Sequence, residues 1–369
     1  MSSYQLSCRL QVASRSSKFP ATCDLRLATC HLPPATCHLP PLKQKLFTFA
    51  KIAISLGLIA YVFSKVHVEA VLASLASANP WLILLALVFY LVAIVIGGAK
   101  WNVLLRALDV YVPFSSVLRY MFVGFFFNNV FPANIGGDVM RGYGMARATD
   151  RTADAAVSVV IDRLIGLLAY MSTAAVMAIV VITVMGHTNL RWLFNLALVA
   201  LVVMVAALAV LFSRRLRRQV GQIFNWGPLT GLLPIYTGMS NALDAYRFRY
   251  RALLIAFLLA LLGLMATNVD NWLLFEATGG GVPFVDVMLF NPLIALVLLV
   301  PISIGGHGVI QGAYPFFYTL LGVPFEQAVA VSVLMSAIII VGSLPGGILW
   351  LRIRRTQDDS QSLSASQPG

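Results

Sequence analysis

Charged residues are scarce in this sequence. Only 11% of its 369 residues are charged, 59% are hydrophobic, and the mean hydropathy is +0.86. This composition excludes a soluble globular protein, and apolar runs of 18 or more residues recur along the chain. Runs of that length are typical of bilayer-crossing helices, because about 20 helical residues span the hydrocarbon core. The sequence therefore predicts a polytopic helical membrane protein.

Cysteine is missing from most of the chain, so disulfides cannot hold the membrane part together. All four cysteines precede the first apolar run: Cys8, Cys23, Cys30 and Cys37. Two of them lie in identical Ala-Thr-Cys-His-Leu-Pro-Pro heptads, whose adjacent Cys-His pairs lack the Cys-x-x-Cys spacing of metal sites. We predict no metal and no other cofactor. Residues 1–42 are predicted to be a disordered extension, or a translated tandem repeat upstream of a true start near residues 42–46.

Two short segments interrupt the apolar runs in the same way. Phe131–Gly142 and Val300–Gly312 both contain Pro-x-[Asn/Ser]-Ile-Gly-Gly, 169 positions apart. Irregular backbone at membrane depth is tolerated only where protein or a water-filled cavity covers it, and paired breaks in two halves point to a transporter-like site. The alternative is two ordinary kinks in packed helices. The shared pattern, with Asp138 and Arg141 in the first copy, favours a functional core.

The fold class that we predict is all-α, with about six full spans and two Gly-Gly/Pro-broken re-entrant hairpins. The second and third spans enclose one hairpin and the fifth and sixth enclose the other, which gives an inverted repeat. This domain covers residues 43–355, and the polar residues 356–369 are predicted to be a disordered tail. Lys100-Trp101 is interpreted as an interfacial base and aromatic that close the second span. The predicted spans are Leu46–Ser64, Trp81–Ala99, Ala155–Met185, Trp192–Phe212, Ala252–Phe275 and Gln327–Trp350.

Basic residues outnumber acidic ones, 26 against 14, for a net charge of +12. They flank the apolar runs, where bases set topology and meet anionic headgroups, and no nucleic-acid motif is visible. We therefore predict no nucleic-acid partner. With re-entrant hairpins and a cytoplasmic N-terminus, eighteen flanking bases face the cytoplasm and only Lys65 and Arg191 face outward. This bias predicts a multi-pass protein of the cell (inner) membrane with both termini in the cytoplasm.

The motifs resemble the lysylphosphatidylglycerol synthase/flippase-like membrane domain family, the UPF0104-type integral membrane proteins. The similar stretches are Asn129-x-x-Pro132-x-x-x-Gly136-Gly137-Asp138-x-x-Arg141, Asp162-Arg163, and Pro301-x-Ser303-x-Gly305-Gly306-x-Gly308. The resemblance implies a membrane domain that moves or handles lipids. It also implies an acid shortly after the second glycine cluster, where this chain has Gln311.

The first functional hypothesis is a flippase-like translocase of a membrane phospholipid or a polyprenyl-linked lipid. Arg141 would bind a phosphate headgroup, and Asp138 would hold that arginine or carry a proton. Two interpretations of Asp162-Arg163 stay open, namely snorkelling at the interface and facing a cavity. The candidate substrate-binding residues are Asn129, Asn134, Gly136, Gly137, Asp138, Arg141, Asp162, Arg163, Ser303, Gly305, Gly306, His307 and Gln311.

Two other hypotheses stay open. One is an intramembrane enzyme that uses Asp138, Asp162 and His307 as acid/base groups, although no nucleophile–base pair or metal spacing supports it. The other is a membrane partner of a separately encoded transferase. The resemblance implies that a soluble domain performs aminoacyl transfer in full-length synthases, and no such domain is visible here. We therefore expect no lysyl transfer by this chain alone, and we favour a transporter over an enzyme.

Overall fold

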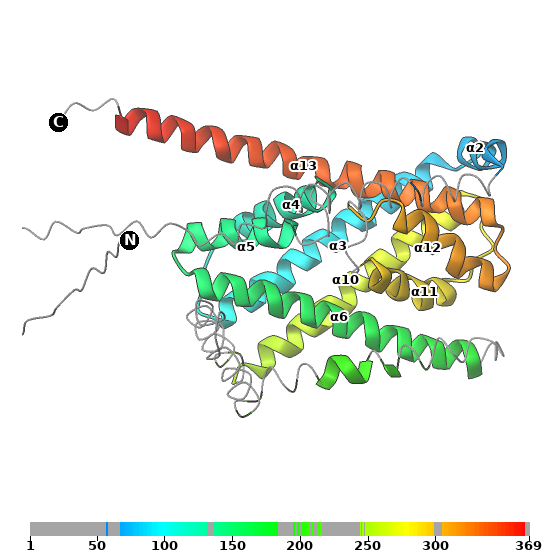
Figure 1. The fold of residues 1–369 in the computed structure, drawn as a ribbon, viewed down its shortest axis with the longest axis horizontal. Coiled ribbons are helices and arrows are strands. Elements are labelled where there is room, and N and C mark those ends of the chain that lie inside the picture. The colour runs from blue at the N-terminus through cyan, green and yellow to red at the C-terminus, as the bar shows by residue number, and fades with distance from the viewer. Residues whose placement is uncertain are drawn as a thin grey trace, which may run out of the picture.

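Four long helices form the frame of the molecule (Figure 1). The computed structural model describes chiefly residues 67–130, 136–183, 249–298 and 305–365, with isolated positions outside them, and the secondary structure there is helical. Each long helix contains a stretch long and apolar enough to cross a membrane: α3 (Pro80–Ala107), α6 (Thr152–Thr183), α10 (Tyr250–Ala277) and α13 (Phe325–Ala365). They correspond to the predicted second, third, fifth and sixth spans. The extension 1–42, nearly all of the first span and much of the fourth lie outside the described residues.

Each predicted hairpin is a pair of shorter helices. The first motif joins α4 (Phe114–Val130) to α5 (Gly136–Thr149), and the second joins α11 (Phe284–Val297) to α12 (Val309–Tyr318). With 14 residues in α5 and α11 and 10 in α12, these helices are shorter than the roughly 20 residues that a full crossing needs. In Figure 1, α4 and α5 lie at one end of the molecule and α11 and α12 at the other. The hairpins therefore enter from opposite ends.

The first half of the bundle (α3 to α6) and the second half (α10 to α13) pack against each other reciprocally. α3 and α10 lie side by side and antiparallel, because the Asn79 N–H before α3 donates to the Ala277 carbonyl at the end of α10 (3.0 Å). At the opposite end, the Tyr246 hydroxyl donates to the Leu104 carbonyl (2.8 Å), and burial raises the pKa of Tyr246, which keeps it a donor. α4 packs on α13, and α11 packs on α6. This exchange is what a two-fold axis in the membrane plane produces, so the predicted inverted repeat is confirmed.

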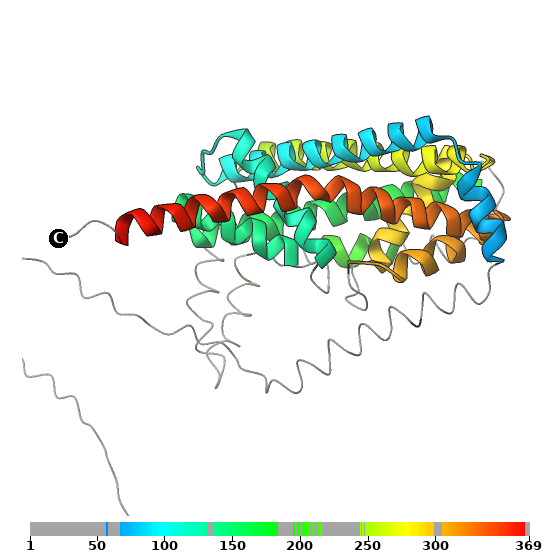
Figure 2. The same ribbon diagram turned by 90° about the horizontal axis from the view of Figure 1, so that it is seen from above.

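Apolar side chains fill the two ends of the bundle separately. One large buried cluster surrounds Trp101 and Leu104 of α3, and a second surrounds Phe290 of α11 and Tyr318 of α12. A small third cluster joins Val71 of α2 (Val68–Ala76) to α13. Exposed leucine, valine and isoleucine side chains cover the outer faces of α3, α10 and α13, as expected for helices that face lipid. In Figure 2 the long helices all run along the long axis of the molecule, whereas Figure 1 shows α3 and α10 crossing α6 and α13 at an angle.

Two helices extend beyond their predicted ends. α13 continues to Ala365, into the predicted disordered tail, since extending an existing helix adds one backbone hydrogen bond per residue without a new nucleation step. α3 continues past Lys100 to Ala107, and Trp101 is completely buried. Its indole N–H donates to Ser158 Oγ of α6 (3.0 Å). The interpretation of Trp101 as an interfacial anchor is therefore wrong, because packing against α6 covers this end of α3.

Candidate functional site: a cationic cavity between the two halves

The start of α5 brings the acid and the base of the first motif together. Positions three apart share a helix face, and Arg141 Nε lies 3.0 Å from Asp138 Oδ1. Asn128 Oδ1 of α4 accepts from the Gly137 N–H (2.9 Å) and satisfies an amide that the helix start leaves unpaired. A Cβ at Gly137 would lie only 2.0 Å from the Gly124 carbonyl oxygen. Glycine at this position therefore permits the close approach of α5 to α4.

Five charged side chains form an alternating chain across α3, α5 and α6, in the order Arg163, Asp138, Arg141, Asp162, Lys100. Arg163 Nε pairs with the second oxygen of Asp138, and Arg141 Nη2 lies 2.8 Å from Asp162 Oδ2. Lys100 Nζ lies 3.0 Å from Asp162 Oδ1 and donates to the Asp162 carbonyl oxygen (3.2 Å). Three bases and two acids leave one net positive charge, and both end members are cations.

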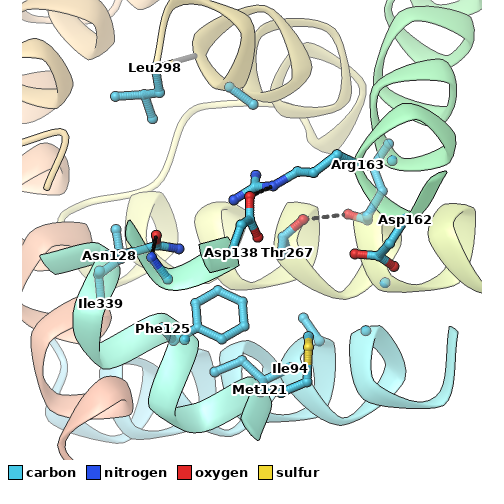
Figure 3. Close-up of a pocket in the computed structure, with 18 of the residues that line it drawn as sticks. Ile94, Met121, Phe125, Asn128, Asp138, Asp162, Arg163, Thr267, Leu298 and Ile339 are labelled. Atoms are coloured by element: carbon cyan, nitrogen blue, oxygen red, sulfur yellow. Dashed lines mark hydrogen bonds and ion pairs between the residues drawn. The ribbon is translucent and has the colours of Figure 1, made fainter. Parts of the chain in front are cut away.

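The two arginines in this alternating series of charges differ in accessibility. Arg141 also donates to Met121 Sδ (3.3 Å), and its guanidinium carbon lies 5.0 Å from the centre of the Trp101 ring, a cation–π contact. Its side chain is only 6% exposed, whereas that of Arg163 is 40% exposed. Arg141 is thus the fixed centre of the alternating series of charges, and Arg163 is the accessible end of that series. Figure 3 shows Arg163 reaching from α6 to Asp138.

All five of these side chains line a cavity of about 370 Å³ between the two halves. This volume falls within the roughly 300–1,000 Å³ of ligand pockets. Apolar side chains such as Phe125 and Leu298 also line the cavity (Figure 3). Five helices each contribute a glycine to the lining: Gly97, Gly124, Gly137, Gly166 and Gly263. At these positions a ligand can approach the main chain closely, because no side chain lies in between.

The second motif reaches the same cavity. Gly305 and Gly306 line it, and Gly305 has a positive φ of 60°. A Cβ at Gly305 would lie 3.0 Å from the Asn129 carbonyl oxygen, so the two hairpins meet where α4 ends. The Asn129 amide donates to Ser343 Oγ of α13 (2.8 Å). Residues at the two Gly-Gly motifs are therefore in contact, as expected for paired breaks that build one site.

A family model described as the lysylphosphatidylglycerol synthase TM region matches residues 48–346. The chain belongs to this family. It is similar to archaeal UPF0104 membrane proteins, with 24% identity over 294 residues to one from Pyrococcus horikoshii, covering 74% of this chain and 87% of the relative. Relatives from Methanothermobacter thermautotrophicus and Methanocaldococcus jannaschii are 23% and 22% identical over 287 and 318 residues. These alignments cover 70% and 83% of this chain, and 81% and 94% of the relatives. No solved structure is significantly similar. The family and the long apolar helices make this a multi-pass membrane protein.

The structure brings most of the described candidate residues together at the cavity. The lining ones are Asn129, Gly137, Asp138, Arg141, Asp162, Arg163, Gly305 and Gly306. Gly136, His307 and Gln311 are not among the lining residues. Gln311 instead accepts from the Gly308 N–H (2.6 Å) and donates to Ser336 Oγ of α13 (2.8 Å), which fastens the glycine turn to α13. Asn134 and Ser303 lie outside the described residues.

Lys100 and Asn128 are among the lining residues that the predicted set does not contain. Lys100 was placed at the end of a span, where a base ordinarily faces headgroups. A signal against that interpretation was available, since apolar residues at helical spacing, Leu104 and Leu105 among them, continue beyond it. Asn128 lies at the end of an apolar run directly beside Asn129. It caps the start of α5 from the far side of a five-residue break, and no sequence pattern indicates such a contact.

Proposed function

We propose that this chain is a flippase-like translocase that binds the phosphate group of a membrane phospholipid or of a polyprenyl-linked lipid in the cavity. The alternating chain with cations at both ends is the observation that supports it. An anion placed against Arg163 or Lys100 extends the alternation and neutralises the excess positive charge. Arginine suits this role because its planar guanidinium forms paired hydrogen bonds with phosphate.

The proposed roles of the charged residues follow from their partners. Arg163 and Lys100 contact the phosphate. Arg141, buried between two acids, positions the chain, which differs from the phosphate contact that the motif alone suggested for it. Asp138 and Asp162 each hold two cationic side chains in place. The lipid tails would remain among the apolar faces of the bundle, and antiparallel halves around one cavity suit alternating access.

The proposal includes a location and a partner. We place the protein in the cell membrane with both termini in the cytoplasm, because the flanking bases favour that orientation. A separately encoded transferase that supplies or receives the lipid is compatible with this role. An intramembrane enzyme has less support: each cavity acid is held by two bases, and His307 does not line the cavity.

Translocation of tail-labelled fluorescent phosphatidylglycerol in proteoliposomes, read by dithionite quenching, tests the proposal. Arg163→Gln and Lys100→Gln should each lower the initial rate about tenfold or more, because a hydrogen bond to a charged group contributes about 1.5–3 kcal/mol. Arg151→Gln is the matched control, since its exposed ion pair with Asp154 (2.8 Å) lies outside the cavity lining. Wild-type protein that moves no phospholipid, or equal loss in all three variants, would refute the proposed function.

A further inference from the structure

A buried acid lies just beyond the cavity wall. Asp270 of α10 is completely buried, and within the described part of the chain neither of its carboxylate oxygens has a hydrogen-bond partner. It has no ion pair there either, in contrast to Asp138 and Asp162, whose carboxylates each contact two bases. Ionisable groups inside a membrane domain are expensive and normally paired, so an unpartnered one marks a functional position.

Polar groups flank Asp270, but their hydrogen bonds go to other partners, and within the described residues the Asn268 amide nitrogen is buried without a partner, as the Asp270 oxygens are. Asn291 of α11 donates to Asn268 Oδ1 (2.7 Å), and the Tyr314 hydroxyl of α12 donates to Asn271 Oδ1. The Asn271 amide donates back to the Thr267 carbonyl (2.8 Å). The Asp270 carboxylate is thus left without a donor, although amides flank it along α10.

The titratable groups that face Asp270 are phenols. They are Tyr90 of α3 and Tyr314 of α12. No lysine, arginine or histidine in the described residues pairs with Asp270, and its side chain is completely buried. A carboxyl in such surroundings is favoured in its neutral form, and it becomes an anion only when water or a cation reaches it.

This position is connected to the cavity. Thr267 and Tyr90 both line the cavity. Asp270 follows Thr267 by three residues on α10, which is about 4.5 Å along the axis at 1.5 Å per residue. A change in the wall at Thr267 or Tyr90, such as that expected when a lipid headgroup enters, therefore alters the surroundings of Asp270.

We propose that Asp270 is a proton-binding site that couples lipid movement in the cavity to a proton gradient. The coupling rests on the proposed function of the cavity, whereas proton binding does not. Asp270 holds the proton on a carboxyl oxygen in the arrangement described here and gives it to water when the cavity rearranges. A metal ion fits less well, because such ions take several oxygen ligands, the neighbouring amide oxygens are already bonded, and no cluster of three acidic, histidine or cysteine side chains occurs among the described residues.

Infrared difference spectroscopy of the full chain in liposomes tests proton binding directly. A pH step should produce the carbonyl band of a protonated carboxyl in the wild type. Asp270→Asn should lose that band, and Asp270→Glu should shift it, which also covers the case in which the asparagine variant does not fold. Asp154→Asn, an acid with an ion pair outside the cavity lining, should leave the band unchanged. A band that is absent from the wild type, or that persists in Asp270→Asn, overturns the proposal.

The same proteoliposomes test the coupling. An imposed pH gradient should raise the rate of phosphatidylglycerol translocation at least threefold in the wild type and in Asp270→Glu. Asp270→Asn should keep the rate measured without a gradient and lose the response. The coupling is overturned if a sodium gradient raises the translocation rate and a pH gradient does not. It is also overturned if Asp270→Asn responds to the pH gradient as the wild type does. If the wild type moves no lipid, the cavity proposal and the coupling both fail, and the infrared band still decides whether Asp270 binds a proton.

Discussion

Arg141 and Arg163 carry the same charge in one cavity but are held very differently. Arg141 contacts two carboxylates, the Met121 sulfur and the face of Trp101, and it is almost completely buried. Arg163 has a side chain that is 40% exposed. Removing the charge from the first leaves buried carboxylates short of a partner, whereas water reaches the second. The same substitution should therefore have different consequences at the two positions.

We predict that Arg141→Gln lowers the free energy of unfolding by about 3–5 kcal/mol, the usual effect of removing one partner from a buried ion pair. Arg163→Gln should unfold at nearly the wild-type temperature while losing lipid translocation. Thermal unfolding in detergent, followed by tryptophan fluorescence, measures both. Arg151→Gln controls for the general loss of a positive charge. Equal melting temperatures for the Arg141 and Arg163 variants would contradict the assignment of a fixed centre and an accessible end.

The pairing of Asp138 with Arg141 was predictable, because it depends only on helical spacing. The rest of the alternating chain was not. Lys100 and Asp162 are 62 positions apart, and their contact depends on how α3 crosses α6. A single sequence gives the polar face of each helix but not the angle at which two helices cross. For the same reason, both interpretations of Asp162-Arg163 were consistent with the sequence, and only the packed structure places the pair at the cavity.

The glycines of α5 differ in how much space surrounds them, even though they lie on one helix. At Gly137 an added Cβ would lie 2.0 Å from the Gly124 carbonyl oxygen and 2.6 Å from Asn128 Oδ1, so α5 would have to move away from α4. At Gly142 the nearest atom to an added Cβ is Val159 Cγ2 at 3.5 Å, an ordinary contact. The hairpin is therefore sensitive to side-chain size at its start and tolerant further along.

We expect Gly137→Ala to destabilise the protein strongly, with a lower melting temperature and loss of translocation. Gly142→Ala should be neutral or stabilise by up to about 1 kcal/mol, because alanine favours a helix interior over glycine. The pair is matched in chemistry and in host helix, so melting curves recorded together isolate the effect of the close approach. Similar melting temperatures for the two variants would show that α4 and α5 are not packed as described.

The order of helices was largely predictable, and their ends were less so. Proline and glycine pairs marked the breaks, apolar length marked the spans, and flanking bases gave the sidedness that required re-entrant hairpins. The ends of α3 and α13 were set by other factors. Partners on α6 keep Trp101 and the residues after it in a buried helix, and helix propagation carries α13 to Ala365.

The inverted repeat predicts that corresponding turns of the two halves face opposite sides of the membrane. Tyr111 lies in the turn between α3 and α4, Pro324 lies directly before α13, and both are exposed. In Figure 1 the end of α3 and the start of α13 lie at opposite ends of the bundle. In a background without the four native cysteines, Tyr111→Cys and Pro324→Cys should react with a membrane-impermeant maleimide from opposite sides. The flanking bases predict that the Tyr111 side is cytoplasmic. Labelling of both positions from one side would exclude the inverted arrangement.

The reciprocal packing of α4 on α13 and of α11 on α6 has a consequence for biogenesis. The first hairpin leaves the ribosome long before its partner α13 has been made, so it must wait in the membrane with its packing face uncovered. The second half meets the reverse situation, because α11 finds α6 already inserted. Assembly is therefore completed only with the last span, and neither half is an autonomous folding unit. Any ancestor that consisted of one half could have closed this structure only by pairing with a second copy in the opposite orientation.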